Sequence, residues 1–202
     1  DRVFLMYCRG EYYKRFIHYN SFSGDAGNNW AAVDSNRVEH CLIRHGTEAA
    51  IWTNSNNYGF YYVKDNTFHD TPLIYASSMG SYELVIQNNT ATNVFNYGFY
   101  ITSILVYDHY SHISSWTGDT LYAVIDNNTI EYDPDRQAET CIFVYHTGQG
   151  SANPNYVRQV TISNNTIDMS SATNGRGIDY YNNFETNNNV LDILNNNISN
   201  VY

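Results

Sequence analysis

The chain has 202 residues, a formal net charge of −10 and only ten Lys and Arg residues. This length is enough for one domain with its own core, and the lack of a basic stripe disfavours a nucleic-acid partner. No apolar run is long enough to span a membrane, and no signal peptide begins at Asp1. Twenty Tyr residues and abundant Asn, with few charges, are typical of an extracellular or cell-surface protein, which is the location that we expect.

One short unit recurs along the chain, with apolar residues two positions before and two positions after an Asn pair. The period of two on both sides indicates strands, and Asn tolerates the left-handed backbone that a sharp corner requires. The unit therefore predicts a strand, an Asn corner and a second strand. Its copies, some of them weak, lie at residues 16–22, 38–43, 62–68, 85–91, 124–130, 161–167 and 192–198.

The second residue of each pair is expected to stack on its equivalents in a ladder of hydrogen-bonded amides. Separations between copies range from 21 to 39 residues, which favours a solenoid with insertions over a regular propeller. The predicted ladder residues are Asn20, Cys41, Asn66, Asn89, Asn128, Asn165 and Asn196.

With its apolar-x-Asn-Asn-Thr-Ile unit, the chain resembles the right-handed parallel β-helix proteins of the pectate lyase-like superfamily. The resemblance covers nearly the whole chain and implies an all-β, right-handed parallel β-helix solenoid of about seven coils with an Asn ladder. We expect residues 1–202 to form one such domain, either complete or part of a longer solenoid. The superfamily contains lyases, hydrolases and non-catalytic surface proteins, so it does not by itself imply an activity.

A further strand is expected in each coil, between successive corners. The candidate strands are residues 30–33, 49–53, 72–76, 98–102, 141–145 and 177–181. If Ile51, Ile74 and Ile178 point inward, alternation turns Trp52, Tyr75 and Asp179 outward. Sugar rings stack on exposed aromatic faces without needing charge, so Trp52, Tyr75, Tyr145 and Tyr181 are the predicted ligand-binding stripe for a polysaccharide or glycan.

A catalytic alternative is a carbohydrate-active enzyme, for which we expect a polysaccharide lyase acting on an acidic polysaccharide. Such an enzyme needs a base to remove a proton and a cation to neutralise the neighbouring carboxylate. Arg37, His40, Arg44 and His45 form the one sequence cluster that offers both, and they are the candidate catalytic residues. The acidic chain would repel a polyanion unless the local field differed, and outward polar residues of two strands would give the same pattern.

Metal binding is a weaker possibility. Glu131, Asp133, Asp135 and Glu139 could together hold Ca²⁺, although a solvated acidic loop with Arg136 explains them equally well. His109, His112 and Asp119 could bind a transition metal only if their loop folded back. No metal or other cofactor is required by the sequence.

The three cysteines, Cys8, Cys41 and Cys141, are an odd number without metal-binding spacing, and we expect small buried residues and no disulfide framework. We expect strands to run directly to residues 1 and 202, with no covering helix at either end. Open sheet edges invite pairing, so we expect either a longer solenoid or self-association through uncapped coils. The leading hypothesis is a structural, assembly or glycan-binding role.

Overall fold

The computed structural model describes ten segments of the chain, and every structural statement below concerns them: residues 2–19, 33–54, 58–77, 80–96, 98–104, 120–136, 140–147, 157–169, 176–182 and 189–200. Within these segments the regular structure consists of β-strands, and all strand pairs are parallel. The predicted all-β parallel β-helix is confirmed.

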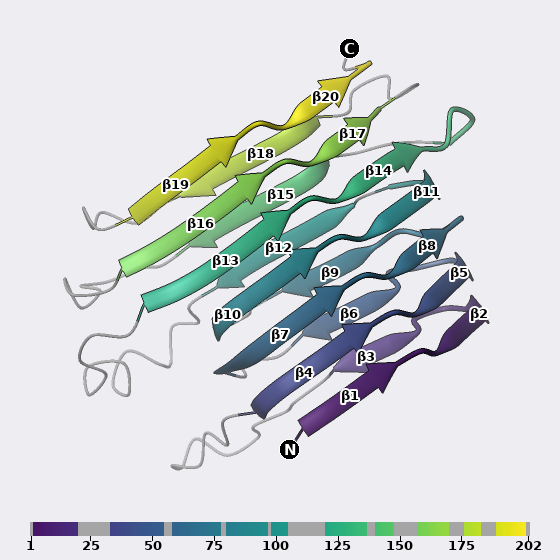
Figure 1. Cartoon of the computed structure of the whole chain (residues 1–202), viewed down its shortest axis with the longest axis horizontal. Helices are drawn as coiled ribbons and strands as arrows, with labels where there is room; N and C mark the ends of the chain where they lie inside the picture. The colour runs from purple at the N-terminus through teal and green to yellow at the C-terminus, as the bar shows by residue number, and fades with distance from the viewer. Residues whose placement is uncertain are drawn as a thin grey trace.

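The strands form three sheets that wind around one core (Figure 1). The first sheet has seven strands: β1 (Arg2–Met6), β4 (Val33–Glu39), β7 (Tyr58–Lys64), β10 (Gly80–Gln87), β13 (Thr120–Asp126), β16 (Val157–Ser163) and β19 (Asn189–Leu194). The second sheet also has seven: β2 (Arg9–Tyr13), β5 (Leu42–Gly46), β8 (Thr67–His69), β11 (Thr90–Val94), β14 (Thr129–Tyr132), β17 (Thr166–Asp168) and β20 (Asn197–Ser199).

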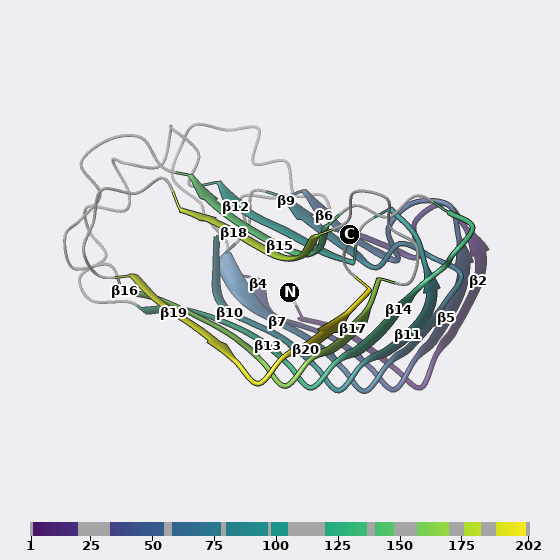
Figure 2. The same cartoon turned by 90° about the horizontal axis from the view of Figure 1, so that it is seen from above.

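The third sheet has six strands and faces the first across the interior (Figure 2). Its strands are β3 (Ile17–Tyr19), β6 (Ile51–Asn54), β9 (Ile74–Ser77), β12 (Phe99–Ile104), β15 (Thr140–Thr147) and β18 (Arg176–Asn182). Five of the six segments predicted to supply this sheet overlap strands β6 to β18. The predicted inward orientation of three isoleucines is confirmed, because Ile51 and Ile74 are buried and Ile178 packs against the core.

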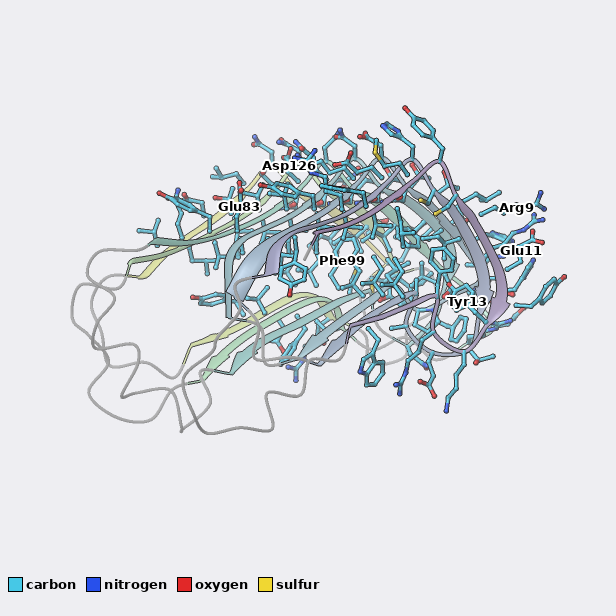
Figure 3. All side chains as sticks on the ribbon, turned by 90° about the horizontal axis from the view of Figure 1, so that it is seen from below. Arg9, Glu11, Tyr13, Glu83, Phe99 and Asp126 are labelled. Atoms are coloured by element: carbon cyan, nitrogen blue, oxygen red, sulfur yellow. The ribbon has the colours of Figure 1, made fainter. Side chains whose placement is uncertain are left out.

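The core is a stack of inward apolar side chains from successive coils. Ile86, Ile125 and Ile162 are fully buried in neighbouring strands of the first sheet, and Phe68 and Ile130 are buried in the second. Phe99, from the third sheet, lies in the interior between the sheets (Figure 3). Each coil therefore buries its apolar face mainly against the coils before and after it, as in other solenoids.

The corner between the first and second sheets holds the Asn ladder. Asn66, Asn89, Asn128 and Asn165 are almost completely buried. Each amide oxygen accepts a hydrogen bond from the backbone N–H of the preceding ladder residue. Where that preceding residue is Asn, its side-chain amide also donates to the same oxygen, and these bonds measure 2.9–3.0 Å. Each amide nitrogen also donates to a backbone carbonyl, such as that of Val38, Val63, Ile86 or Ile125. The predicted ladder is confirmed at these positions and at Asn196.

The residue before each ladder position takes the left-handed backbone conformation. Its φ lies between 53° and 57° at each described corner between the first and second sheets, at Tyr7, His40, Asp65, Asn88, Asn127, Asn164 and Asn195. Asn accommodates this conformation with little strain, which explains the first Asn of each pair. The side chain of this residue lies on the outside, where Asn127 Nδ2 donates to Asn88 Oδ1 at 2.9 Å.

The first coil corrects two sequence-based assignments. The ladder position of the first coil is Cys8, because Leu42 N donates to Cys8 O as Thr67 N donates to Cys41 O. Within the predicted corner 16–22, Ile17–Tyr19 is a third-sheet strand in register with β6, and the predicted ladder residue Asn20 lies outside the described residues. Of the segment 30–33, only Val33 is described, and it begins β4 in the first sheet. The sequence did not reveal this corner, because Cys8 stands where later corners have Asn.

Replacing Asn128 by Ala should destabilise the protein strongly. The change leaves the N–H and the side-chain amide of Asn89, the carbonyl of Ile86 and the amide oxygen of Asn165 without this partner inside the core. Each unsatisfied buried group costs about 1–3 kcal/mol, so we expect a loss of roughly 3 kcal/mol or more in the free energy of unfolding, measured by urea denaturation. The neighbouring exposed Thr129 provides the control variant Thr129→Ala, with a loss of about 0.5 kcal/mol or less. Equal losses in the free energy of unfolding for the two variants would show that the ladder does not stabilise the protein.

Candidate functional site

A row of aromatic residues runs across the third sheet. In the strand register Trp52 pairs with Tyr75, Tyr75 with Tyr100, and Tyr100 with Phe143. His18 precedes this row and Asp179 follows it. We call Trp52, Tyr75, Tyr100 and Phe143 the aromatic row. These positions alternate along their strands with a buried row, Ile51, Ile74, Phe99 and Ile142.

The predicted stripe of Trp52, Tyr75, Tyr145 and Tyr181 falls into two rows. Trp52 and Tyr75 belong to the aromatic row, whereas Tyr145 and Tyr181 pair with each other two residues further along their strands. Tyr100 and Phe143, which complete the aromatic row, were not predicted. The structure describes the backbone at Tyr75, Tyr100, Tyr145 and Tyr181, and their side chains lie outside what it describes.

Trp52 is held by charged neighbours from the first coil. The guanidinium carbon of Arg15 lies 3.9 Å from the centre of the Trp52 ring, a cation–π contact. Arg15 Nε in turn lies 2.5 Å from Glu48 Oε2, and Lys14 Nζ lies 3.0 Å from Glu48 Oε1. One end of the aromatic row is therefore fixed in position by an ion-pair network.

The four candidate catalytic residues occupy three places on the surface. Arg37 lies in the first sheet, with its guanidinium carbon 4.9 Å from the centre of the Tyr62 ring. His40 lies on the first corner and stacks on Tyr7, with ring centres 5.0 Å apart. Arg44 and His45 are neighbours at the end of β5 in the second sheet. The contacts that the structure describes for these residues are to partners outside the predicted set.

The end of the second sheet brings together residues that are far apart in the sequence. His45 Nδ1 lies 3.0 Å from Asp70 Oδ2, and Arg136 Nη1 lies 2.7 Å from Asp70 Oδ1. The ring of Tyr12 stacks on His45 at 4.8 Å, and His69 meets His45 edge-on at 5.9 Å. We call His45, His69, Asp70 and Arg136 the second-corner cluster.

The charge state of Asp70 determines what His45 can do. The hydrogen bond from His45, together with the charge of Arg136, lowers the pKa of Asp70, so the carboxylate is ionised at neutral pH. An ionised carboxylate only accepts hydrogen bonds, which places the proton of neutral His45 on Nδ1 and leaves Nε2 as an acceptor. This arrangement could position a general base, a role that needs no metal.

Arg44 lies beside this cluster and forms an ion pair with an acidic residue. Its guanidinium pairs with Glu11, which also binds Arg9. Arg9 and Glu11 lie on the outer side of the second sheet, away from the core (Figure 3). Hydrogen bonds from Arg9 and Arg44 lower the pKa of Glu11. The cations here are matched by carboxylates, so the corner does not form a concentrated positive patch.

The acidic loop after β14 is partly described. Arg136 Nε lies 3.3 Å from Asp133 Oδ2, and Asp133 Oδ1 accepts a hydrogen bond from the backbone of Asp135. Glu139, like His109, His112 and Asp119, lies outside the described residues. Within the described part of the chain, no group of three or more His, Cys, Asp or Glu residues has the geometry of a metal site.

Comparison with known proteins identifies no relative. No protein-family model, no curated protein and no solved structure matches the chain at a significant level. Across the described segments, no helix is long and apolar enough to cross a membrane. The parallel β-helix fold is established by the structure, and membership of the pectate lyase-like superfamily stays a prediction.

The Asp70 interactions should make stability depend on pH in the acid range. Because the folded-state pKa of Asp70 is lowered, its contribution is complete above the unfolded-state pKa of about 3.9 and is lost as pH falls toward the folded-state value. Asp70→Asn should therefore lower the free energy of unfolding by roughly 1 kcal/mol near pH 6, and the difference from the wild type should shrink below about pH 4. Urea denaturation of both proteins over this pH range measures the difference in the free energy of unfolding.

The exposed carboxylate of Asp135 provides the matched control, Asp135→Asn. This variant should follow the wild-type pH profile. A gap between Asp70→Asn and the wild type that stays constant down to about pH 2 would show that the contribution of Asp70 to stability does not depend on its ionisation.

Proposed function

We propose that this parallel β-helix is an extracellular or cell-surface protein that binds a neutral glycan along the aromatic row of the third sheet. The observation that carries the proposal is the register of Trp52, Tyr75, Tyr100 and Phe143, which occupy equivalent positions in four neighbouring strands. Neighbouring strands are about 4.8 Å apart, so the row presents aromatic positions at a short and regular interval. Sugar rings bury C–H surface against such rings without needing charge.

The charge of the chain supports a neutral ligand. With a net charge of −10, the protein would repel a polyanion over most of its surface. Apolar stacking has no such penalty. The row also lies on regular strands, which hold a binding surface more rigidly than loops do.

A role in assembly is part of the same proposal. Strands β1 and β19 lie at opposite edges of the first sheet. Phe4 and Met6 on β1, and Ile193 and Leu194 on β19, are each exposed by 45–51%. Apolar side chains on an edge strand favour pairing with a further strand, which either a continuing solenoid or a second copy of the chain would supply.

Loss of aromatic rings from the row should weaken glycan binding. Tyr75→Leu and Tyr100→Leu keep apolar volume but remove the stacking surface, and each should lower the affinity for a neutral polysaccharide roughly two- to tenfold, because an aromatic contact contributes about 0.5–1.5 kcal/mol. Isothermal titration calorimetry with a panel of neutral and acidic oligosaccharides measures the effect.

Tyr122 provides the matched control, because it is an exposed Tyr in the first sheet. Tyr122→Leu should bind as the wild type does. The proposal fails if the wild type binds no neutral glycan, or if Tyr122→Leu loses as much affinity as the two row variants.

The second-corner cluster favours a second candidate function, a polysaccharide lyase. His45, oriented by Asp70, would take the proton next to a uronate carboxylate on Nε2, and Arg44 or Arg136 would neutralise that carboxylate. To act in this way the arginine would have to exchange its present acidic partner for the substrate. The acidic chain and the matched charges of this corner make it the second candidate.

Variants of the two corner histidines distinguish lyase activity from glycan binding without catalysis. His45 and His40 both have a left-handed backbone and both stack on a Tyr, but only His45 has an aspartate partner. If the chain cleaves acidic polysaccharide, His45→Ala should lower the rate at least about a hundredfold and His40→Ala should leave it nearly unchanged, as followed by the absorbance of the unsaturated product. Loss of activity in His40→Ala alone would instead favour a site on the first corner.

A further inference from the structure

Two cysteines replace asparagine in the first two rungs of the inner ladder. Cys41 N donates to Asn66 Oδ1 at 2.9 Å, as Asn66 N donates to Asn89 Oδ1 at 3.0 Å, so Cys41 occupies a ladder position. Cys8 occupies the position below it, because Leu42 N donates to Cys8 O at 2.9 Å. The flanking residues confirm the register, with Met6 paired with Glu39 and Arg9 with Leu42.

The two thiols are therefore direct neighbours in the stack. Equivalent residues of adjacent parallel strands lie about 4.8 Å apart, and disulfides join Cα atoms about 4.4–6.8 Å apart. Burial, and after it the hydrogen bond with Cys41, raises the pKa of the Cys8 thiol to about 12. Cys41 is buried and Cys8 is half-buried, so oxidants reach Cys8 first.

The rung that these cysteines form lacks the amide–amide bond of the later rungs. Asn rungs are linked by side-chain amide bonds of 2.9–3.0 Å. The Cys41 thiol instead makes long contacts to the carbonyls of Glu39 and Leu5, at 3.3 and 3.6 Å. The first coil is therefore attached to the second without the amide–amide bond that joins the later coils.

We propose that Cys8 and Cys41 form a disulfide under oxidising conditions, which fastens the first coil to the second where the amide ladder is missing. The oxidant is a small-molecule disulfide such as oxidised glutathione. The Cys8 thiolate attacks one of its sulfurs, forming a mixed disulfide and releasing one glutathione. The Cys41 thiolate then attacks Cys8 Sγ, forming the Cys8–Cys41 bond and releasing the second glutathione.

The exchange is balanced, because two protein thiols are oxidised while one glutathione disulfide is reduced to two thiols, which take up the two protons. The thiolate is the attacking species. The raised pKa of Cys8 therefore makes the reaction slow at neutral pH and faster as pH rises. Cys141, buried at the start of a third-sheet strand, has no part in it.

The test oxidises the native full chain with oxidised glutathione, blocks the remaining thiols with an alkylating agent and maps the peptides by mass spectrometry. We expect a Cys8–Cys41 link and one remaining thiol, on Cys141. The rate of linking should rise with pH, and the oxidised protein should unfold at a higher temperature than the reduced protein. Cys141→Ser should behave as the wild type, whereas Cys8→Ser and Cys41→Ser should form no internal link and show no such shift in unfolding temperature.

Circular dichroism of the reduced variants establishes that each one is folded before oxidation, and Cys8→Ala repeats the test with an apolar replacement in the half-buried position. Three thiols that stay free, a mixed glutathione disulfide that persists on Cys8 while Cys41 stays reduced, or a link that includes Cys141 would each overturn the proposal.

Discussion

The hydrogen-bonded stack of buried asparagines is the interaction on which the rest of the structure depends. At the corner between the first and second sheets the chain turns sharply inside the molecule, where backbone groups cannot reach water. The amides of Asn66, Asn89, Asn128 and Asn165 satisfy these groups and link each coil to the next. A slip of one residue would move the amide out of the corner and reverse the faces of both adjoining strands. The ladder therefore fixes the register of the strands that adjoin this corner.

A fixed register places equivalent residues of successive coils in continuous rows. The aromatic row on the third sheet and the second-corner cluster are both products of this arrangement, although their residues are separated by irregular insertions in the sequence. They differ in chemistry. The row consists of aromatic residues at equivalent positions of four strands, whereas the cluster contains one imidazole oriented by a carboxylate beside paired charges. The proposed glycan site uses the first and the lyase alternative uses the second, and the two lie on different sheets.

The sequence was sufficient for the fold because the corner has strict local requirements. A left-handed residue followed by a buried amide leaves a recognisable Asn pair at four corners, and the flanking apolar alternation extended the prediction to Asn66 and Cys41. It failed in the first coil, where Tyr7 and Cys8 take the two places and no Asn marks them. The segment around Asn20 has the right pattern of apolar residues, but it supplies the third-sheet strand β3.

The candidate sites were less predictable because they depend on which strands become neighbours. His45 was selected from the sequence, but its partners Asp70 and Arg136 come from later coils, and variable insertions hide that alignment. The aromatic row was half predicted for the same reason: Tyr145 and Tyr181 are aligned with each other, yet two residues away from the row that contains Trp52. The Asn spacing alone does not give the register within the third sheet.

The most direct test of the glycan-binding role is a crystal structure of the chain soaked with the neutral oligosaccharide that binds it best. The sugar rings should lie against the third sheet over Tyr75 and Tyr100, with successive rings following the aromatic row. Sugar bound at the second corner beside His45, or no bound sugar at saturating concentration, would contradict this account.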